Sequence, residues 1–224
     1  MIHGGSWESG DRTEFPDLNP YLAARAYVVA AIDYRLAPAH CFPAPIDDVD
    51  RALSFLRARA GEYGIDRDRI VLLGRSAGGQ IALTAAYRAA SPGIRGVVGF
   101  YAPTDMVWSW EHSLDTTFID GRRVVESYMG GSPDNLPGRY RDASPLALAN
   151  ETSPATLLFH GGRDTLVSPQ QSQRLATRLA ELGVPHLLVA IPGATHAFDV
   201  GFSGPMGQVS TYAIERFLAA VVAP

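Results

Sequence analysis

Residues Ile70–Leu83 have the sequence IVLLGRSAGGQIAL. The first half is an apolar run that ends at a glycine, which predicts a buried strand, and the second half favours a helix. Between them lies Gly-x-Ser-x-Gly, centred on Ser76. A serine on a tight strand-to-helix turn exposes its hydroxyl, and the helix N-terminus behind it stabilises negative charge. The pattern predicts that Ser76 is a nucleophile; the alternative is a serine that only caps the helix.

Apolar runs alternate with amphipathic stretches on both sides of this segment. Further strands are predicted at 27–33, 96–101, 156–160 and 186–191. These runs are apolar throughout, so both of their faces are expected to be buried, as in a parallel sheet. The alternation predicts an α/β fold with a mostly parallel, doubly wound sheet and helices on both faces.

No repeat or low-complexity linker divides the 224 residues, so we expect one domain spanning 1–224. Residues 104–150 lack a strand pattern, are rich in aromatic residues and contain a predicted short helix near 122–129. A long insertion between core strands is often a lid or a pocket wall. The alternative is a surface excursion that is packed by its own aromatic side chains.

The composition excludes several classes of function. The net charge is −4 and there is no basic run, so nucleic acid is not an expected partner. All 19 basic residues are arginine, which excludes Walker-A, Schiff-base and Ser–Lys chemistry. No CxxC or HExxH spacing predicts a metal site, and no cofactor is expected.

The sequence also predicts the cellular location of the chain. No apolar run reaches the roughly 18 to 20 residues that a membrane span requires, and no signal-peptide pattern is present. The single cysteine, Cys41, cannot form an internal disulfide. We therefore expect no membrane span and a cytoplasmic location.

Polar residues follow the predicted strands where a site would form. His196 follows the strand at 186–191, and Asp164 follows the strand at 156–160. The carboxyl ends of parallel strands share one edge of a sheet, which is where such folds place their sites. Asp105 follows the strand at 96–101 and is the alternative to Asp164 as the acid. The histidines other than His196 are predicted to have structural roles. The glycines of His3–Trp7, HGGSW, suit a loop whose amides approach an oxyanion, or an ordinary turn.

The chain resembles the hormone-sensitive-lipase-like esterases of the α/β-hydrolase superfamily. The matching segments occur in the family's order: HGGSW at 3–7, DYRLAP at 33–38, FPAPIDDV at 42–49, GRSAGG at 74–79, GRDTL at 162–166 and HAF at 196–198. The resemblance implies a triad in the chain order serine, acid, histidine, formed by Ser76, Asp164 and His196. It also implies an oxyanion hole formed by the amides of Gly5, Ser6 and Ala77.

Two positions depart from the family pattern. Ser6 occupies the third position of the glycine motif, and Arg75 stands where many relatives carry an acidic residue. The HGGSW form also resembles arylformamidases and some feruloyl or acetyl-xylan esterases. The leading expectation is a carboxylesterase for small-molecule esters with short acyl chains. The alternatives are an arylformamidase or amide hydrolase with the same triad, and a catalytically impaired relative that acts as a binding protein.

Two further expectations concern the substrate pocket and the edge of the sheet. The expected substrate contacts are Trp7, Trp108, Trp110 and Phe198, with Phe202 as a further candidate. In the family, a strand inside the sheet leads into the HGG loop, so this chain is expected to be an N-terminally truncated form. An open apolar strand edge pairs readily with another chain, which predicts a homodimer that covers the edge between 27–33 and 70–74. The family-level alternative is a dimer through the final strand and helix.

Overall fold

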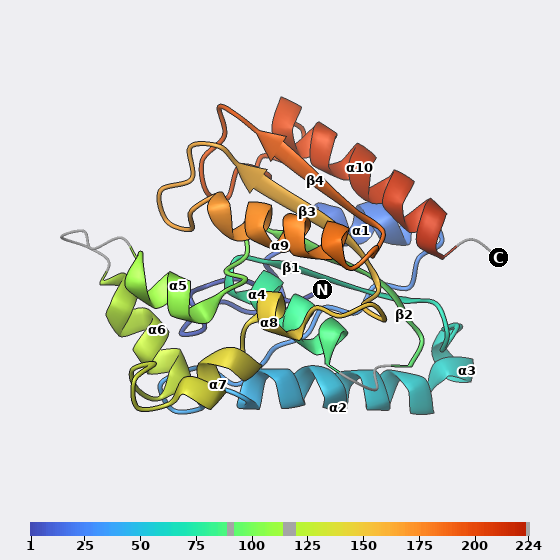
Figure 1. The fold of residues 1–224 in the computed structure, drawn as a ribbon. Coiled ribbons are helices and arrows are strands. Elements are labelled where there is room, and N and C mark those ends of the chain that lie inside the picture. The colour runs from blue at the N-terminus through green and yellow to red at the C-terminus, as the bar shows by residue number, and fades with distance from the viewer. Residues whose placement is uncertain (89–91, 114–119, 223–224) are drawn as a thin grey trace.

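The computed structural model describes residues 1–88, 92–113 and 120–222, and its centre is a parallel sheet (Figure 1). The sheet has the order β1-β2-β3-β4, and every neighbouring pair is parallel. The strands are β1 (Ile70–Arg75), β2 (Ile94–Phe100), β3 (Ala155–Gly161) and β4 (His186–Ile191). All four lie where apolar runs predict strands, so these four predictions are confirmed.

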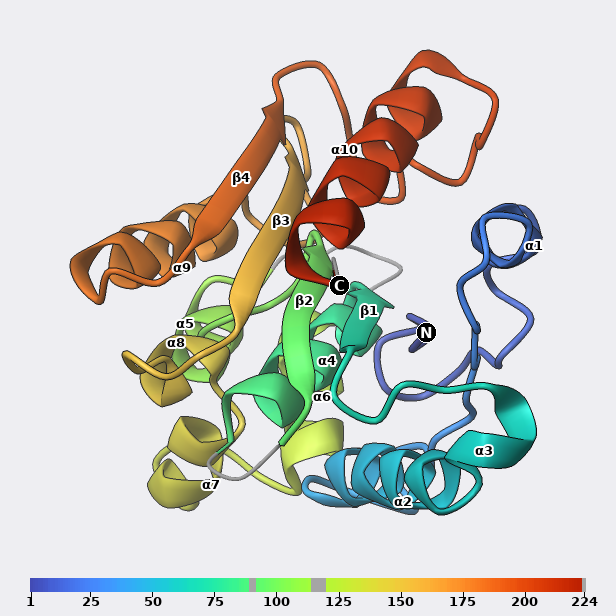
Figure 2. The same cartoon turned by 90° about the vertical axis from the view of Figure 1, so that its right-hand side faces the viewer.

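Helices cover both faces of the sheet. Successive side chains of a strand point to opposite faces, so Leu72 joins one core and Leu73 the other. In Figure 2 the strands β3 and β4 lie between α9 and α10. The core on the face of Leu72 includes residues of α2 (Ala44–Ala58), α4 (Ala77–Tyr87) and α9 (Gln170–Glu181). The core on the face of Leu73 includes residues of α1 (Leu18–Ala23) and α10 (Pro205–Val221).

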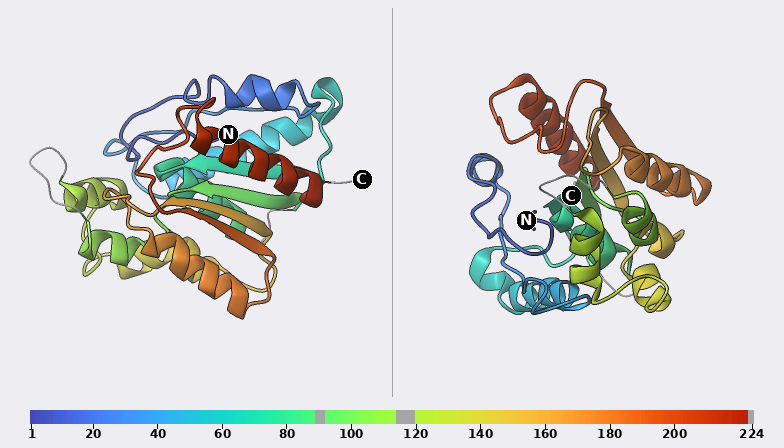
Figure 3. Two further views of the ribbon diagram at one scale, coloured as in Figure 1. Left: turned by 90° about the horizontal axis from the view of Figure 1, so that it is seen from above. Right: turned by 90° about the vertical axis from the view of Figure 1, so that its left-hand side faces the viewer.

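The described part of the segment between β2 and β3 consists of short helices joined by turns and loops. It contains α5 (Met106–Glu111), α6 (Gly121–Met129), α7 (Pro137–Asp142) and α8 (Pro145–Leu148), and a short α3 (Ala60–Tyr63) lies earlier in the chain. The Asp120 side chain caps α6 by accepting from the Arg123 amide at 2.9 Å, and the helix predicted near 122–129 is confirmed. Helices α5 and α6 stand at one end of the sheet (Figure 3). Residues 114–119 of the predicted insertion lie outside the described residues.

The predicted strand at 27–33 is wrong. Ile32 makes one isolated parallel bridge, to Ile2, and Ile2 makes a second bridge to Gly74. The Ile2 amide donates to Leu73 O at 2.8 Å, and the Ile32 amide donates to Met1 O at 3.1 Å. A strand requires a hydrogen-bonded neighbour along its length. Met1 and Ile2 pair with this run only at Ala30 and Ile32.

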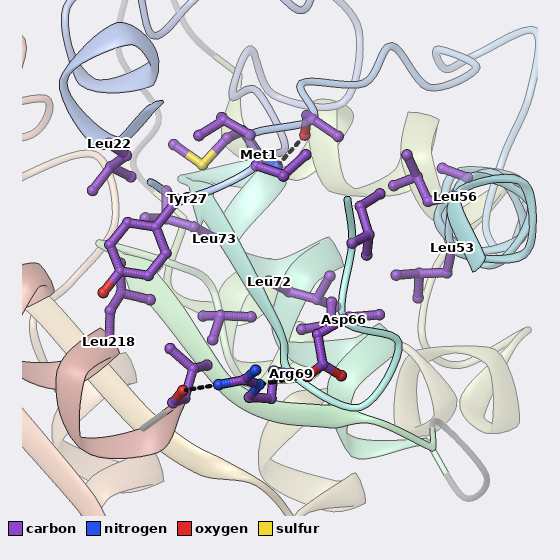
Figure 4. A pocket seen from close by; sticks show the side chains of 18 of the residues that line it. Met1, Leu22, Tyr27, Leu53, Leu56, Asp66, Arg69, Leu72, Leu73 and Leu218 are labelled. Atoms are coloured by element: carbon purple, nitrogen blue, oxygen red, sulfur yellow. Dashed lines mark hydrogen bonds and ion pairs between the residues drawn. The ribbon is translucent and has the colours of Figure 1, made fainter. Parts of the chain in front are cut away.

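An apolar cavity of about 380 Å³, the edge cavity, lies between β1 and residues 26–32 (Figure 4). Tyr27, Leu53 and Leu72 are among its lining residues. Val28 also lines the cavity, and 55% of its surface is exposed. The edge cavity is larger than the cavity beside Ser76 that is described below. Neither Ser76 nor any other residue of the candidate site lines the edge cavity.

Candidate active site

Ser76 lies on a strained turn between β1 and α4. Its φ is +49°, a value that residues with a β-carbon rarely adopt, and its amide donates to Phe100 O at 2.9 Å. The neighbouring glycines allow close approach of the chain: a β-carbon on Gly74 would lie 2.1 Å from Gly78 O, and one on Gly78 would lie 2.2 Å from His3 O. The Gly-x-Ser-x-Gly pattern therefore allows strand, helix and HGG loop to meet at Ser76.

The structure brings Ser76, His196 and Asp164 together. His196 Nε2 lies 3.1 Å from Ser76 Oγ, and His196 Nδ1 lies 2.7 Å from Asp164 Oδ2. The rival acid, Asp105, is engaged elsewhere: it caps α5 by accepting from the Trp108 amide at 3.1 Å and forms an ion pair with Arg174 at 2.9 Å. This arrangement can pass a proton from the hydroxyl of Ser76 to an imidazole that a carboxylate orients.

Asp164 is buried but well supplied with donors. Its Oδ1 accepts from the amides of Leu166 and Val167, both at 2.9 Å, and its Oδ2 lies 3.4 Å from His160 Nε2. Burial alone would raise the pKa of this carboxyl group, but hydrogen bonds from His160, His196 and the Val167 amide outweigh it and hold the pKa of Asp164 well below its usual range. Asp164 therefore stays ionised at neutral pH.

Three main-chain amides near Ser76 have no acceptor in the part of the chain that the structure describes. Among the described residues, the amides of Gly5, Ser6 and Ala77 donate no hydrogen bond to the protein. Ser6 and Ala77 line a small cavity beside Ser76, whereas Gly5 does not. Unpaired amides at a helix N-terminus and in a glycine-containing loop can stabilise an oxyanion.

The small cavity beside Ser76, the site cavity, measures about 70 Å³. One wall comes from α5, α6 and their neighbouring residues, and another comes from the loop after β3. Its lining residues include Trp108, Ser109, His112, Val124 and Leu166. The segment between β2 and β3 therefore supplies part of the wall beside the nucleophile.

Only some of the predicted substrate contacts lie in this cavity. Trp108 lines it, and Trp7 also borders it, but the Trp7 side chain is 4% exposed, stacks on Tyr128 and donates to Gln80 Oε1 at 2.9 Å. Trp7 thus fastens the HGG loop to the core. Trp110 is not among the lining residues and donates to Glu126 at 2.8 Å.

Phe198 and Phe202, which are also predicted to contact the substrate, have other neighbours in the structure. Neither lines the site cavity. Phe198 packs edge-on against Tyr101, with ring centroids 5.6 Å apart, and Phe202 packs in the same way against Tyr21 at 5.3 Å. Both rings find partners on the α10 side of the sheet, which the sequence could not indicate.

Sequence analysis missed several residues that hold the site. His160, predicted to be only structural, is buried beside Asp164, with Nδ1 2.7 Å from Ser172 Oγ and Nε2 2.9 Å from Val167 O. Tyr101 is buried, and its ring centroid lies 4.4 Å from that of His196. The one available signal for Tyr101 was a polar aromatic residue at the end of a predicted strand.

Backbone strain is concentrated around the site. Six residues other than glycine have a positive φ in the described part of the chain, and five of them lie here. They are Ser6, Trp7, Ser76, Tyr101 and Ala197. Such strain is stored at functional sites more often than elsewhere.

The described residues offer no cluster of three or more His, Cys, Asp or Glu side chains that could hold a metal ion. Within the same residues, every helix is too short or too polar to cross a membrane.

The model of the BD-FAE family matches residues 1–179. This chain belongs to the BD-FAE family. Like the solved structure of a fungal esterase from Rhizomucor miehei, this BD-FAE member has the α/β-hydrolase fold: the TM-score is 0.84 at 24% identity, covering 99% of this chain and 73% of that one. The predicted fold class and the resemblance to α/β-hydrolase esterases are confirmed.

Curated relatives of this BD-FAE member are named as esterases. It is 31% identical over 237 residues to Esterase LipC of Mycobacterium tuberculosis (strain ATCC 25618 / H37Rv), covering 97% of this chain and 57% of LipC. It is 30% identical over 238 residues to the probable carboxylic ester hydrolase LipM of the same strain, covering 100% of this chain and 54% of LipM. The chain thus spans about half the length of the curated relatives it matches.

Proposed function

We propose that this chain is a serine carboxylesterase that cleaves small-molecule esters through an acyl-enzyme on Ser76. The observation that carries the proposal is the continuous line of contacts from Ser76 Oγ to His196 Nε2 at 3.1 Å and from His196 Nδ1 to Asp164 at 2.7 Å. The esterase names of the relatives support it.

In the first half of the reaction, Ser76 Oγ attacks the acyl carbon and its proton moves to His196 Nε2. Asp164 holds the opposite ring nitrogen, which fixes the tautomer and stabilises the imidazolium. The amides of Gly5, Ser6 and Ala77 stabilise the tetrahedral oxyanion, and each such donor typically contributes about 3 kcal/mol. His196 then protonates the departing alcohol.

In the second half, water replaces the alcohol. His196 takes a proton from the water, the resulting hydroxide attacks the acyl-enzyme, and the same amides hold the second oxyanion. Collapse of this intermediate releases the carboxylic acid and returns the proton to Ser76. These steps require no cofactor.

We propose a preference for short acyl chains, because the site cavity of about 70 Å³ is small. A panel of nitrophenyl esters from acetate to decanoate tests it, with N-formylkynurenine assayed beside them. We expect kcat/KM to fall steeply beyond the shortest acyl groups. Faster cleavage of the formamide would favour the amide-hydrolase alternative, and no turnover of any compound by a folded protein would favour the binding protein.

We further propose a homodimer that covers the edge cavity. The open side of β1, the apolar lining and the exposed Val28 support it, because a buried unpaired backbone group costs about 1–3 kcal/mol. Analytical ultracentrifugation at micromolar concentration should show a dimer that Val28→Asp dissociates. A stable wild-type monomer would refute the proposed homodimer. The cytoplasmic location predicted from the sequence stays a prediction.

A further inference from the structure

The buried guanidinium of Arg75 contacts two segments that are distant in the sequence, at Glu14 and at Asp199. Arg75 is the last residue of β1, directly before Ser76, and its side chain is 8% exposed. Its Nε donates to Asp199 Oδ2 at 2.7 Å, and its Nη2 lies 2.7 Å from the same oxygen. Asp199 is buried and follows His196 by three residues. The guanidinium therefore holds the loop that carries His196.

Glu14 connects the same guanidinium to the HGG loop. The guanidinium Nη1 donates to Glu14 O at 3.1 Å and lies 3.9 Å from Glu14 Oε1. The Glu14 carboxylate in turn accepts from the Gly4 amide. Glu14 thus fixes the residue directly before the two loop amides, Gly5 and Ser6, that we propose as oxyanion donors.

Tyr101 links the Arg75 ion pair to the imidazole. The Tyr101 hydroxyl donates to Asp199 Oδ1 at 2.7 Å, so both carboxylate oxygens have buried donors. The other side of Tyr101 faces His196, with ring centroids 4.4 Å apart. Burial and the neighbouring charge of Asp199 raise the pKa of Tyr101, which keeps the hydroxyl protonated and donating.

We propose that Arg75 is a positioning residue: its contacts with Asp199 and Glu14 hold the His196 loop and the oxyanion loop in register with Ser76. The proposal rests on the proposed function for its catalytic consequence. Both charges are out of water, and the Phe15 ring covers the guanidinium at 4.1 Å. Removal of either charge leaves the other buried and unpaired, which drives the loop toward water. Small displacements of reacting groups reduce rates by up to about 100-fold.

The first test is kinetic and uses Asp199→Asn and Arg75→Lys. We expect Asp199→Asn to lower kcat about 10- to 100-fold with KM within about 2-fold, because Asp199 itself does not line the site cavity. The rate of fluorophosphonate labelling should fall in parallel. Arg75→Lys keeps the cation but cannot span both partners, so its effect should be intermediate. If Asp199→Asn does not fold, the kcat of Arg75→Lys tests the positioning role instead.

The matched control is Glu215→Gln. Glu215 also accepts from one tyrosine and one arginine, Tyr21 and Arg25, but on the surface between α1 and α10. This variant should retain wild-type kcat and labelling rate. A loss in Glu215→Gln equal to that in Asp199→Asn would overturn the assignment, because any Tyr–Arg–carboxylate cluster would then have the same effect.

The second test does not depend on turnover. Hydrogen–deuterium exchange of Asp199→Asn should rise in residues 3–9 as well as in 194–202, because the effect passes through Arg75 and Glu14. Faster exchange confined to 194–202, or kcat within 2-fold of wild type, would overturn the proposal. Absence of Ser76-dependent hydrolysis in the wild type defeats the proposed function instead, and exchange still tests the coupling of the two loops.

Discussion

Asp164→Asn replaces one carboxylate oxygen by an NH₂ group, and the surroundings decide which one. Oδ1 accepts from two main-chain amides, those of Leu166 and Val167, both at 2.9 Å. The asparagine oxygen should keep that position, since an NH₂ there would face two donors. The NH₂ group then takes the place of Oδ2, 2.7 Å from His196 Nδ1.

In this orientation the asparagine donates to His196 Nδ1. The ring nitrogen must then accept, so the imidazole proton moves to Nε2, which faces Ser76 Oγ at 3.1 Å. An imidazole in this tautomer cannot take the serine proton. We expect kcat to fall about 10⁴-fold, as the same substitution does in other triads, which corresponds to about 5.5 kcal/mol.

The assay is hydrolysis of nitrophenyl acetate under saturating conditions, with circular dichroism to verify folding. The matched control is Asp105→Asn, because asparagine caps helices as well as aspartate does and only the ion pair with Arg174 is lost. Its kcat should stay within about 2-fold of wild type. If Asp164→Asn retained more than a tenth of the activity, or if Asp105→Asn lost more than Asp164→Asn, the assignment of the acid would be wrong.

Four further results are expected. Ser76→Ala should stay folded, hydrolyse at the background rate and lose fluorophosphonate labelling; unchanged labelling would remove Ser76 from the mechanism. The pKa of Asp164 is lower in the folded than in the unfolded chain, so its contribution to stability is complete above about pH 4 and is lost as pH falls further. The difference in unfolding free energy between wild type and Asp164→Asn, from urea unfolding at pH 3 to 6, measures this contribution. Gly78→Ala should lower the free energy of unfolding by about 1–3 kcal/mol, since its β-carbon meets His3 O, and equal melting temperatures would contradict this. Trp108→Ala should enlarge the site cavity and raise the decanoate-to-acetate ratio of kcat/KM; an unchanged ratio would place the acyl group elsewhere.

The features predicted from sequence are those with a local cause. A buried parallel strand requires a continuous apolar run, so Ile70–Arg75 and its three neighbours could be located. Ser76, Asp164 and His196 each follow a strand, and parallel strands bring their carboxyl ends to one edge. The run at 27–33 has the same local character, but strand formation also depends on a neighbour, which a local pattern does not report.

The features not predicted depend on contacts between distant residues. Trp7 and Trp108 are both aromatic residues near a candidate site, yet one fastens a loop through Gln80 and the other lines the cavity. The Arg75–Asp199 pair joins residues 124 positions apart. The sequence marked Arg75 only as a departure from a family pattern and gave no sign of its partner.

The positive φ angles at Ser6, Trp7, Ser76, Tyr101 and Ala197 have a consequence for laboratory evolution. A β-carbon in this conformation costs about 1–2 kcal/mol per residue, a penalty that glycine avoids. Selection of a mutant library for heat resistance alone would therefore enrich glycine at Ser6, Ser76 and Ala197, whose side chains are small, and would discard the nucleophile along with the strain, whereas packing retains the buried Trp7 and Tyr101. A library meant to keep turnover should leave these five codons fixed and diversify the surface of α2 and α10 instead.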